Sequence, residues 1–176
     1  MLFLSGALLP GALSNAATYS ISFVDTEGNK LSTADGHVTI VVLTTTADHE
    51  KARTIADRVP DFCLGNPEYR MITVIHFTRR HMTIGRRVAT AFIRHRVREE
   101  AKRLQARYDA KGISRDASHD IFVVTDFDGT VASQLGESMG VSDFRVFVFG
   151  RTGKLLAQWQ GVPSAADLAA VITQSD

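Results

Sequence analysis

The chain has 176 residues, of which 44% are hydrophobic and 22% charged, so wholesale disorder is excluded and one globular domain with a sizeable core is expected. The net charge of +1 does not single out any class of partner. Cys63 is the single cysteine, which excludes an intramolecular disulfide and a cysteine-based metal site. It stands between Phe62 and Leu64, which favours a buried small hydrophobe over a reactive thiolate.

Residues 1–17 have the character of an export signal that lacks its basic beginning. They combine two short apolar runs with small residues at Ser14–Ala16, where signal peptidase requires them, yet no Lys or Arg precedes Lys30. The segment is too short, and too interrupted by glycine and proline, to span a membrane as a helix. We therefore expect a truncated signal segment or an apolar N-terminal arm, followed by one domain over residues 18–176 that is periplasmic or secreted.

The first half of the domain alternates predicted strands with a predicted helix. Tyr19–Val24 alternates polar and apolar residues before a turn at Asp25–Asn29, which predicts an N-terminal β-hairpin. The apolar run Val38–Thr44 predicts a central strand that is covered on both faces. A helix is expected over Ala47–Val59, with Asp48 as its N-terminal cap.

The middle of the chain predicts a strand over Met71–Phe77 and then a long helix over Thr83–Ala110. The helix has apolar residues at helical spacing, which predict its buried stripe: Ile84, Val88, Phe92, Ile93, Val97, Ala101, Leu104 and Tyr108. Gly112 is a natural end for it.

The last part predicts a strand over Ile121–Thr125, a short helix over Ser133–Met139, and a hairpin of Phe144–Phe149 with Lys154–Gln160. Ser164 is expected to cap a final helix. Strands that alternate with helices predict a mostly parallel sheet with helices on both faces, and the hairpin adds an antiparallel edge.

The long helix carries most of the positive charge. Arg79–Lys111 holds eleven of the 20 Lys and Arg and only three acidic residues. Such a face could contact an anionic surface, including a membrane surface, through six residues: Arg79, Arg80, Arg86, Arg87, Arg94 and Arg96. The alternative, which we favour, is the solvated outer face of a helix that covers the sheet. Aromatic residues do not interleave with these arginines, so nucleic acid is not expected as a partner.

The segment Asp126–Thr130, which follows an apolar strand, matches the nucleophile motif of haloacid dehalogenase-type phosphatases. In that family Asp126 would attack phosphorus and Asp128 would act as acid and base beside a magnesium ion. The family also holds its metal with an acidic pair on a later strand, and no adjacent acidic pair follows Thr130. Aspartate and glycine are common in turns after strands, so the motif alone is weak.

A second resemblance covers about residues 21–174. Three parts of the chain and a terminal helix carry it: Phe23–Gly36 with the Val38–Leu43 strand, then Thr125–Gly136, then Phe144–Gly161. In this order they resemble the redoxins, which are thioredoxin-like domains shared by peroxiredoxins and thiol reductases. The resemblance implies a thioredoxin-like three-layer sandwich with a mixed sheet, an N-terminal β-hairpin and one inserted or extended basic helix.

In redoxins the reactive cysteine follows the strand that corresponds to Val38–Leu43, where a helix N-terminus favours the thiolate. This chain has hydroxyls and an imidazole there instead. The resemblance therefore implies a candidate ligand pocket rather than a thiol centre, formed by Thr44, Thr45, Thr46, Asp48, His49 and Arg145. Thiol reductases also have a cis-proline before the Phe144 strand, and residues 140–144 contain no proline.

These patterns predict a non-catalytic thioredoxin-like domain, exported, that binds an unknown protein or a small ligand. The alternative is an enzyme, either a redoxin relative with altered antioxidant or oxidoreductase chemistry or the phosphatase. No cofactor and no metal are expected, since His76 and His81 are separated by Arg79 and Arg80, whose charges oppose a cation.

Overall fold

The computed structural model of the chain describes residues 19–77, 83–137 and 144–175. Residues 1–17, with the expected signal segment, therefore lie outside the described part. The elements in chain order are β1 (Ser22–Val24), β2 (Lys30–Ser32), β3 (Val38–Thr44), α1 (His49–Arg58), η1 (Asp61–Cys63), β4 (Tyr69–His76), α2 (Thr83–Ala110), η2 (Ala117–Asp120), β5 (Phe122–Asp126), α3 (Thr130–Gln134), β6 (Arg145–Phe149), β7 (Leu155–Gln160) and α4 (Ala165–Thr173).

The main sheet has five strands in the order β5-β4-β3-β6-β7, and β1 and β2 form a separate antiparallel pair. Strands β3, β4 and β5 are parallel, whereas β6 and β7 add antiparallel pairs. All seven residues of β3 are buried, because this strand is central and covered on both faces. The predicted central strand and antiparallel edge hairpin are thus confirmed.

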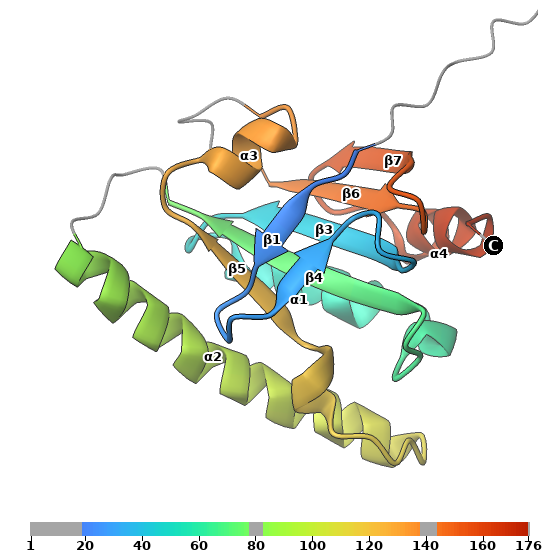
Figure 1. Ribbon diagram of the computed structural model, residues 1–176. Coiled ribbons are helices and arrows are strands. Elements are labelled where there is room, and N and C mark those ends of the chain that lie inside the picture. Colours follow the sequence, from blue (N-terminus) through green and yellow to red (C-terminus); the bar gives the residue numbers. More distant parts are fainter. Residues whose placement is uncertain (1–18, 78–82, 138–143, 176) are drawn as a thin grey trace, which may run out of the picture.

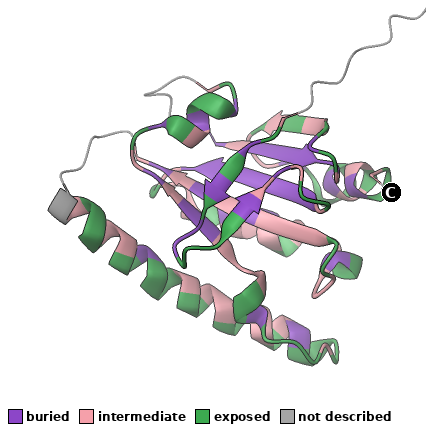
Figure 2. Ribbon diagram, in the orientation of Figure 1, coloured by how far each residue is buried: buried purple, intermediate pink, exposed green. Residues whose placement is uncertain are grey.

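Each face of the sheet has its own core, as Figure 1 shows. The β1–β2 hairpin and α3 lie on one face, where Phe23 and Leu135 pack against Phe147 and Phe149. Helices α1 and α4 cover the other face, where Ile55 and Leu168 join a second core. The mixed sheet is therefore covered on one face by a hairpin and a helix and on the other face by helices. Figure 2 shows that the central strands β3 and β6 are buried along almost their whole length.

Two helix boundaries differ from the prediction. Helix α1 begins at His49 instead of Ala47, and Asp48 is its N-cap residue but makes no side-chain capping bond. Helix α3 spans Thr130–Gln134, whereas the predicted helix starts at Ser133 and ends at Met139, which lies outside the described residues. The earlier start is explained by the buried Asp126 carboxylate, which accepts the first free amides of this helix. A cap supplied from the preceding strand cannot be recognised from helical periodicity.

Helix α2 has the predicted bounds, but its predicted buried stripe is only partly correct. Ile93 and Tyr108 are buried, whereas Val88 and Phe92 are 66% and 55% exposed, so the prediction that these two residues are buried is wrong. A helix of 28 residues is about 42 Å long, while an eight-residue strand such as β4 spans only about 27 Å. The N-terminal part of α2 therefore projects beyond the sheet (Figure 1).

No helix among the described residues has the combined length and apolar character that crossing a lipid bilayer requires.

Candidate functional site

Five of the six predicted pocket residues lie from the end of β3 to the start of α1, and three of them, Thr45, Thr46 and Asp48, lie in the loop between these elements. Asp48 uses its carboxylate locally, since it accepts a bond from Thr45 Oγ1 at 3.3 Å and pairs with Lys51 Nζ at 2.8 Å. Thr44 is buried at the end of β3, and its hydroxyl donates to the Thr45 carbonyl at 3.2 Å. These bonds shape the turn that starts α1.

His49 is the first residue of α1 and lies beside this turn. Its Nε2 lies 3.1 Å from Glu50 Oε1, while its Nδ1 is enclosed and has no hydrogen-bond partner. The side chain as a whole is 42% exposed, so the imidazole is neither fully solvated nor fully satisfied. An enclosed ring nitrogen without a partner is a hydrogen-bonding group that the protein itself leaves unsatisfied.

A cavity of about 650 Å³ begins at this turn and runs between α1, α2 and one face of the sheet. Thr44, Thr45, Thr46 and His49 line it, so the structure brings these four predicted residues together. Asp48 is not among the lining residues. The walls are mostly apolar and come from all three elements: Ala52, Ala56, Met71, Ile93, Val97 and Val123. Cavities of this size and character are typical of small-molecule sites.

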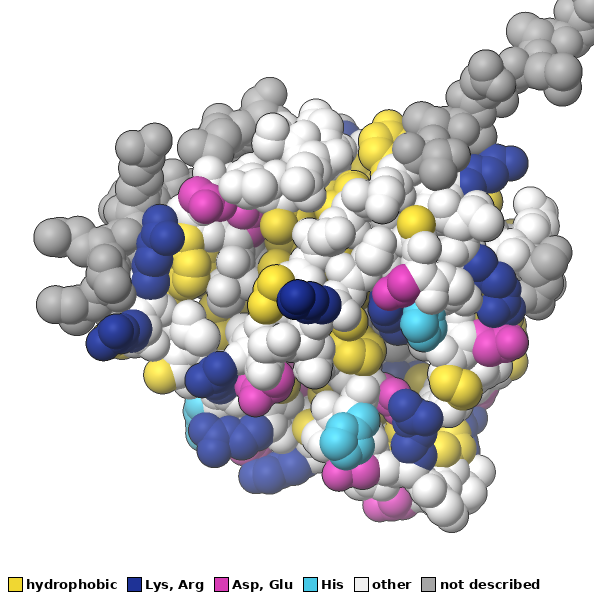
Figure 3. Space-filling model, in the orientation of Figure 1, with side chains coloured by type: hydrophobic (Ala, Val, Ile, Leu, Met, Phe, Trp, Pro, Cys, Tyr) yellow, Lys and Arg dark blue, Asp and Glu magenta, His cyan; other side chains and the backbone are white. Residues whose placement is uncertain are grey.

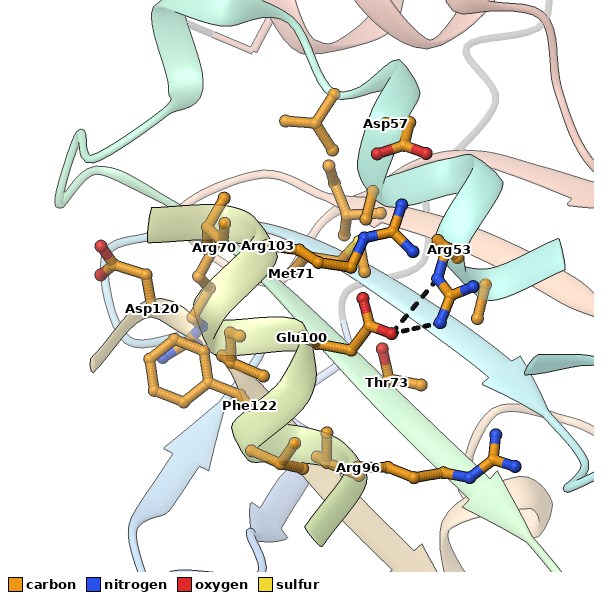
Figure 4. Close-up of a pocket in the computed structure, with 18 of the residues that line it drawn as sticks. Arg53, Asp57, Arg70, Met71, Thr73, Arg96, Glu100, Arg103, Asp120 and Phe122 are labelled. Atoms are coloured by element: carbon orange, nitrogen blue, oxygen red, sulfur yellow. Dashed lines mark hydrogen bonds and ion pairs between the residues drawn. The ribbon is translucent and has the colours of Figure 1, made fainter. Parts of the chain in front are cut away.

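Charged side chains gather on the side of the cavity where α1 faces α2 (Figure 4). Arg53 on α1 donates to Glu100 on α2 at 2.5 and 3.2 Å, and it also pairs with Glu50. The pair to Glu100 raises the pKa of the Arg53 guanidinium. It joins the two helices across the cavity.

Two arginines of α2 face the same region without an acidic partner. Arg96 and Arg103 line the cavity on either side of Glu100, one turn before it and one turn after it. The Arg96 guanidinium lies over the ring of Phe92, 4.9 Å from its centroid, and among the described residues no carboxylate pairs with Arg96 or Arg103. The cavity edge therefore carries uncompensated positive charge.

Tyr108 closes the opposite end of the cavity. Its hydroxyl donates to Asp120 Oδ2 at 2.8 Å and accepts from the Gly65 amide at 2.9 Å. Burial of the ring and the bond to the Asp120 carboxylate raise the pKa of Tyr108 to about 12. This network ties the C-terminal part of α2 to the loop after η1 and to η2.

Arg145 is a correction to the predicted pocket. It pairs in register with Leu43 and points to the same face of the sheet as Phe147, because alternate residues of a strand share a face. There its Nε lies 3.4 Å from Glu137 Oε1. The cavity lies on the opposite face, so Arg145 does not contribute to it.

Cys63 is buried in η1, beyond the C-terminal end of α1. Ten helical residues, about 15 Å, separate that end from the turn where a redoxin has its reactive sulfur. The carbonyl end of a helix lacks the amide groups that stabilise a thiolate. The residue has the buried small-hydrophobe position that its neighbours predict.

We expect no thiol chemistry from Cys63. In a dithiothreitol-driven insulin reduction assay and in a peroxide consumption assay, the wild-type protein and Cys63→Ser should both match the rate without protein. A wild-type rate above this background that the substitution removes would contradict the assignment.

The structure also shows a buried pair that sequence analysis did not identify. His76 and Asp126 are register partners at the carboxyl ends of β4 and β5, and His76 Nδ1 lies 3.2 Å from Asp126 Oδ2. Asp126 is 1% exposed, and its two oxygens also accept the amides of Val131 and Ala132. A carboxylate that is enclosed and bonded in this way lacks the access that a phosphatase nucleophile needs. This pair follows only from the register of β4 against β5, which the sequence does not reveal.

The four described residues among the six predicted anionic contacts have different surroundings. Arg79 and Arg80 lie outside the described residues. Arg86 lies over the Phe127 ring, and Arg94 donates to the Thr26 carbonyl at 2.9 Å. Arg87 is exposed, whereas Arg96 lines the cavity. Figure 3 shows arginine and lysine side chains over the region of α2, separated by acidic and apolar ones.

Within residues 19–77, 83–137 and 144–175, no three side chains of His, Cys, Asp or Glu come together in a group that could hold a metal ion.

Comparison with known proteins identifies the fold. The chain is similar to the exposed lipoprotein thioredoxin Etrx1 of Streptococcus pneumoniae, with a TM-score of 0.55 and 12% identity over 88% of this chain and 98% of that one. A DsbF homologue from Corynebacterium diphtheriae has a TM-score of 0.55 and 14% identity over 99% and 98% of the two chains. StoA from Bacillus subtilis has a TM-score of 0.52 and 14% identity over 89% and 98%.

No family model matches the sequence, and no curated protein matches it either. The structural likeness therefore shows the fold alone. The chain has a thioredoxin-like fold with a mixed five-stranded sheet, an N-terminal hairpin and a long helix α2, and its single cysteine leaves no cysteine pair.

Proposed function

We propose that this protein is a non-catalytic thioredoxin-like binding domain, formed by residues 18–176 and exported from the cytoplasm, whose cavity between α1, α2 and the sheet binds a small molecule. The observation that carries the proposal is the position of this cavity of about 650 Å³. It opens at the turn between β3 and α1, which is the place where redoxins have their reactive cysteine.

The residues of that turn support binding rather than thiol chemistry. Thr44, Thr45 and Thr46 supply hydroxyls and backbone groups, and His49 supplies an enclosed nitrogen without a partner. None of these side chains is a strong nucleophile unless a base is aligned with it, and Asp48 is engaged with Thr45 and Lys51. A cavity with apolar walls and a few polar groups at one end is suited to hold and orient a ligand.

Export is supported by two observations of different kinds. The first is the composition of residues 1–17, which have the apolar runs and small residues of a signal segment. The second is that a structural relative, the pneumococcal thioredoxin, is described as an exposed lipoprotein.

The proposal predicts that filling the cavity prevents binding. N-phenylnaphthylamine, a neutral apolar fluorophore, should bind the wild-type protein at one saturable site, seen as a rise in emission. Val97 lines the cavity, and Val97→Phe should weaken this binding about tenfold, since the added ring occupies ligand volume.

Val88→Phe is the matched control, because Val88 is on the same helix but is 66% exposed and does not line the cavity. It should leave the dissociation constant unchanged. Circular dichroism spectra and unfolding midpoints of both variants test that they fold. Equal loss of binding in the two variants, or no saturable binding by the wild-type protein, would overturn the proposal.

A further inference from the structure

We infer that the ligand of this cavity is an elongated apolar molecule with one anionic head group, and that Arg96 and Arg103 bind the head. The inference rests on the proposed function and narrows it to a class of ligand. A carboxylate, a phosphate monoester and a sulfonate share this chemistry, because each offers oxygens to a guanidinium.

The shape of the cavity requires an elongated apolar part. The lining residues of α2 extend from Phe92 to Tyr108, which corresponds to about 24 Å along the helix. Ile93, Val97 and Leu104 form the α2 wall between these ends. An apolar chain or fused rings along this wall would remove apolar surface from water on both partners, which is the main driving force for such binding.

The charges of the cavity leave a place for one anion. Arg53 is compensated by Glu100 and Glu50, and Arg107 lies 3.8 Å from Asp57. Among the described residues, no carboxylate pairs with Arg96 or Arg103, although both line the cavity. Both arginines are exposed, so water solvates their guanidinium groups when no anion is bound, and an anionic head group would add charge-assisted hydrogen bonds that an uncharged ligand cannot make.

Glu100 already places one carboxylate in this region, and Arg53 compensates its charge. It lies between the two arginines on one face of α2, and its Oε1 is 2.5 Å from Arg53 Nη2 (Figure 4). Its side chain is 38% exposed, so an anion at the same level of the cavity would stay partly solvated. Partial solvation keeps the desolvation cost low, while charge-assisted hydrogen bonds still add affinity.

Phe92 and Arg96 form the edge of the cavity near the N-terminal part of α2. Phe92 is 55% exposed, and Arg96 stacks on its ring with a distance of 4.9 Å to the centroid. The stacking holds the guanidinium beside an apolar surface. An amphipathic anion has a charged head attached directly to an apolar body. At this edge the head can pair with Arg96 while the body packs against Phe92.

Two fluorophores that differ by a single sulfonate test the inference. Wild-type protein should bind anilinonaphthalene sulfonate about tenfold more tightly than neutral N-phenylnaphthylamine. Arg96→Gln and Arg103→Gln should each weaken binding of the sulfonate about tenfold and change binding of the neutral probe less than about twofold. Arg87→Gln, which removes an exposed arginine of α2 outside the cavity, is the matched control and should change neither.

Displacement of the bound sulfonate probe distinguishes two sources of the ligand, a free amphipathic anion and a lipid of a bilayer. Free tetradecanoate should displace it, and tetradecanol should displace it less well. Vesicles of phosphatidylglycerol should compete only if the head-group source is a bilayer lipid.

Each contrary outcome has a separate meaning. Equal affinity of the wild-type protein for the two fluorophores would overturn the anionic ligand while the cavity remains a binding site. If neither tetradecanoate nor the vesicles displace the probe, the inference of an anionic ligand is overturned too. Loss of both fluorophores in Arg96→Gln and Arg103→Gln would assign these arginines to packing and likewise overturn the inference. Absence of binding by either fluorophore to wild-type protein would remove the proposed function as well.

Discussion

Replacing Asp126 by alanine is expected to lower the free energy of unfolding by about 3–5 kcal/mol at neutral pH. The carboxylate is 1% exposed and accepts from two amides at the start of α3, at 3.3 and 3.0 Å, and it pairs with His76. Its removal leaves two buried donors and the partly buried Val131 amide without this acceptor. The value is measured by urea unfolding followed by circular dichroism.

Asp128→Ala is the control for this substitution, because it removes the same group from the same turn. Asp128 is exposed and accepts one bond, from the Thr130 amide at 3.1 Å, so its loss should cost about 1 kcal/mol or less. If the two substitutions have equal effects, Asp126 does not have the buried role described above. Magnesium-dependent hydrolysis of a chromogenic phosphate that Asp126→Asn removes would instead restore the phosphatase interpretation.

Stability should also fall by about 2–3 kcal/mol between pH 10 and pH 12 because of Tyr108. Burial and the bond to Asp120 raise the pKa of Tyr108 from 10.0 in the unfolded chain to about 12 in the folded protein. The folded state therefore holds this proton more tightly than the unfolded state. The contribution is complete below pH 10 and is lost as the pH rises through the folded value.

Comparison with Tyr108→Phe isolates this contribution from other groups that titrate at alkaline pH. At pH 7 the variant should be less stable by about 1.5–3 kcal/mol, because the Gly65 amide and the Asp120 carboxylate lose their partner. The difference between the two proteins, measured by guanidinium unfolding at each pH, should shrink toward zero near pH 12. A difference that stays constant across this range would show that the phenol titrates normally.

The cavity opens at the place in the fold where a redoxin has its reactive cysteine, and this chain has no cysteine there. A thioredoxin-like scaffold presents the start of α1 at the end of a buried parallel strand, and this position suits a reactive group in one protein and a binding surface in another. In this chain Thr44–Thr46 and His49 lie at the turn, and the Arg53–Glu100 bridge links α2 to α1 beside the cavity. The space between the turn, α1, α2 and the sheet forms the cavity.

Local patterns were sufficient wherever one element controls its own structure. The seven-residue run of β3 predicted a strand buried on both faces, and Ser164 predicted the cap of α4, where its Oγ accepts the Asp167 amide at 3.1 Å. The bounds of α2 followed from periodicity and from Gly112. In each case the deciding interactions lie within a few residues of one another, so neighbouring residues carry enough information.

Contacts between distant segments were not accessible in the same way. Arg145 was assigned to the pocket, but the register of β6 against β3 turns it to the other face of the sheet, since a shift of one residue reverses every side chain. The His76–Asp126 pair depends on the register of β4 and β5. Val88 and Phe92 have core-like spacing, but Val88 is exposed where α2 projects beyond the sheet, and Phe92 lies at the edge of the cavity.

The amino-acid sequence alone therefore established the order of the elements, the thioredoxin-like resemblance and the lack of a cysteine where a redoxin needs one. The cavity arises from how far α2 stands from α1 and from the sheet. That separation is set by side chains from three separate segments, including Arg53 and Glu100, which are 47 positions apart. Periodicity reports which side of a helix is apolar, but it contains no information on the distance between that side and its neighbour, and the candidate binding site depends on this distance.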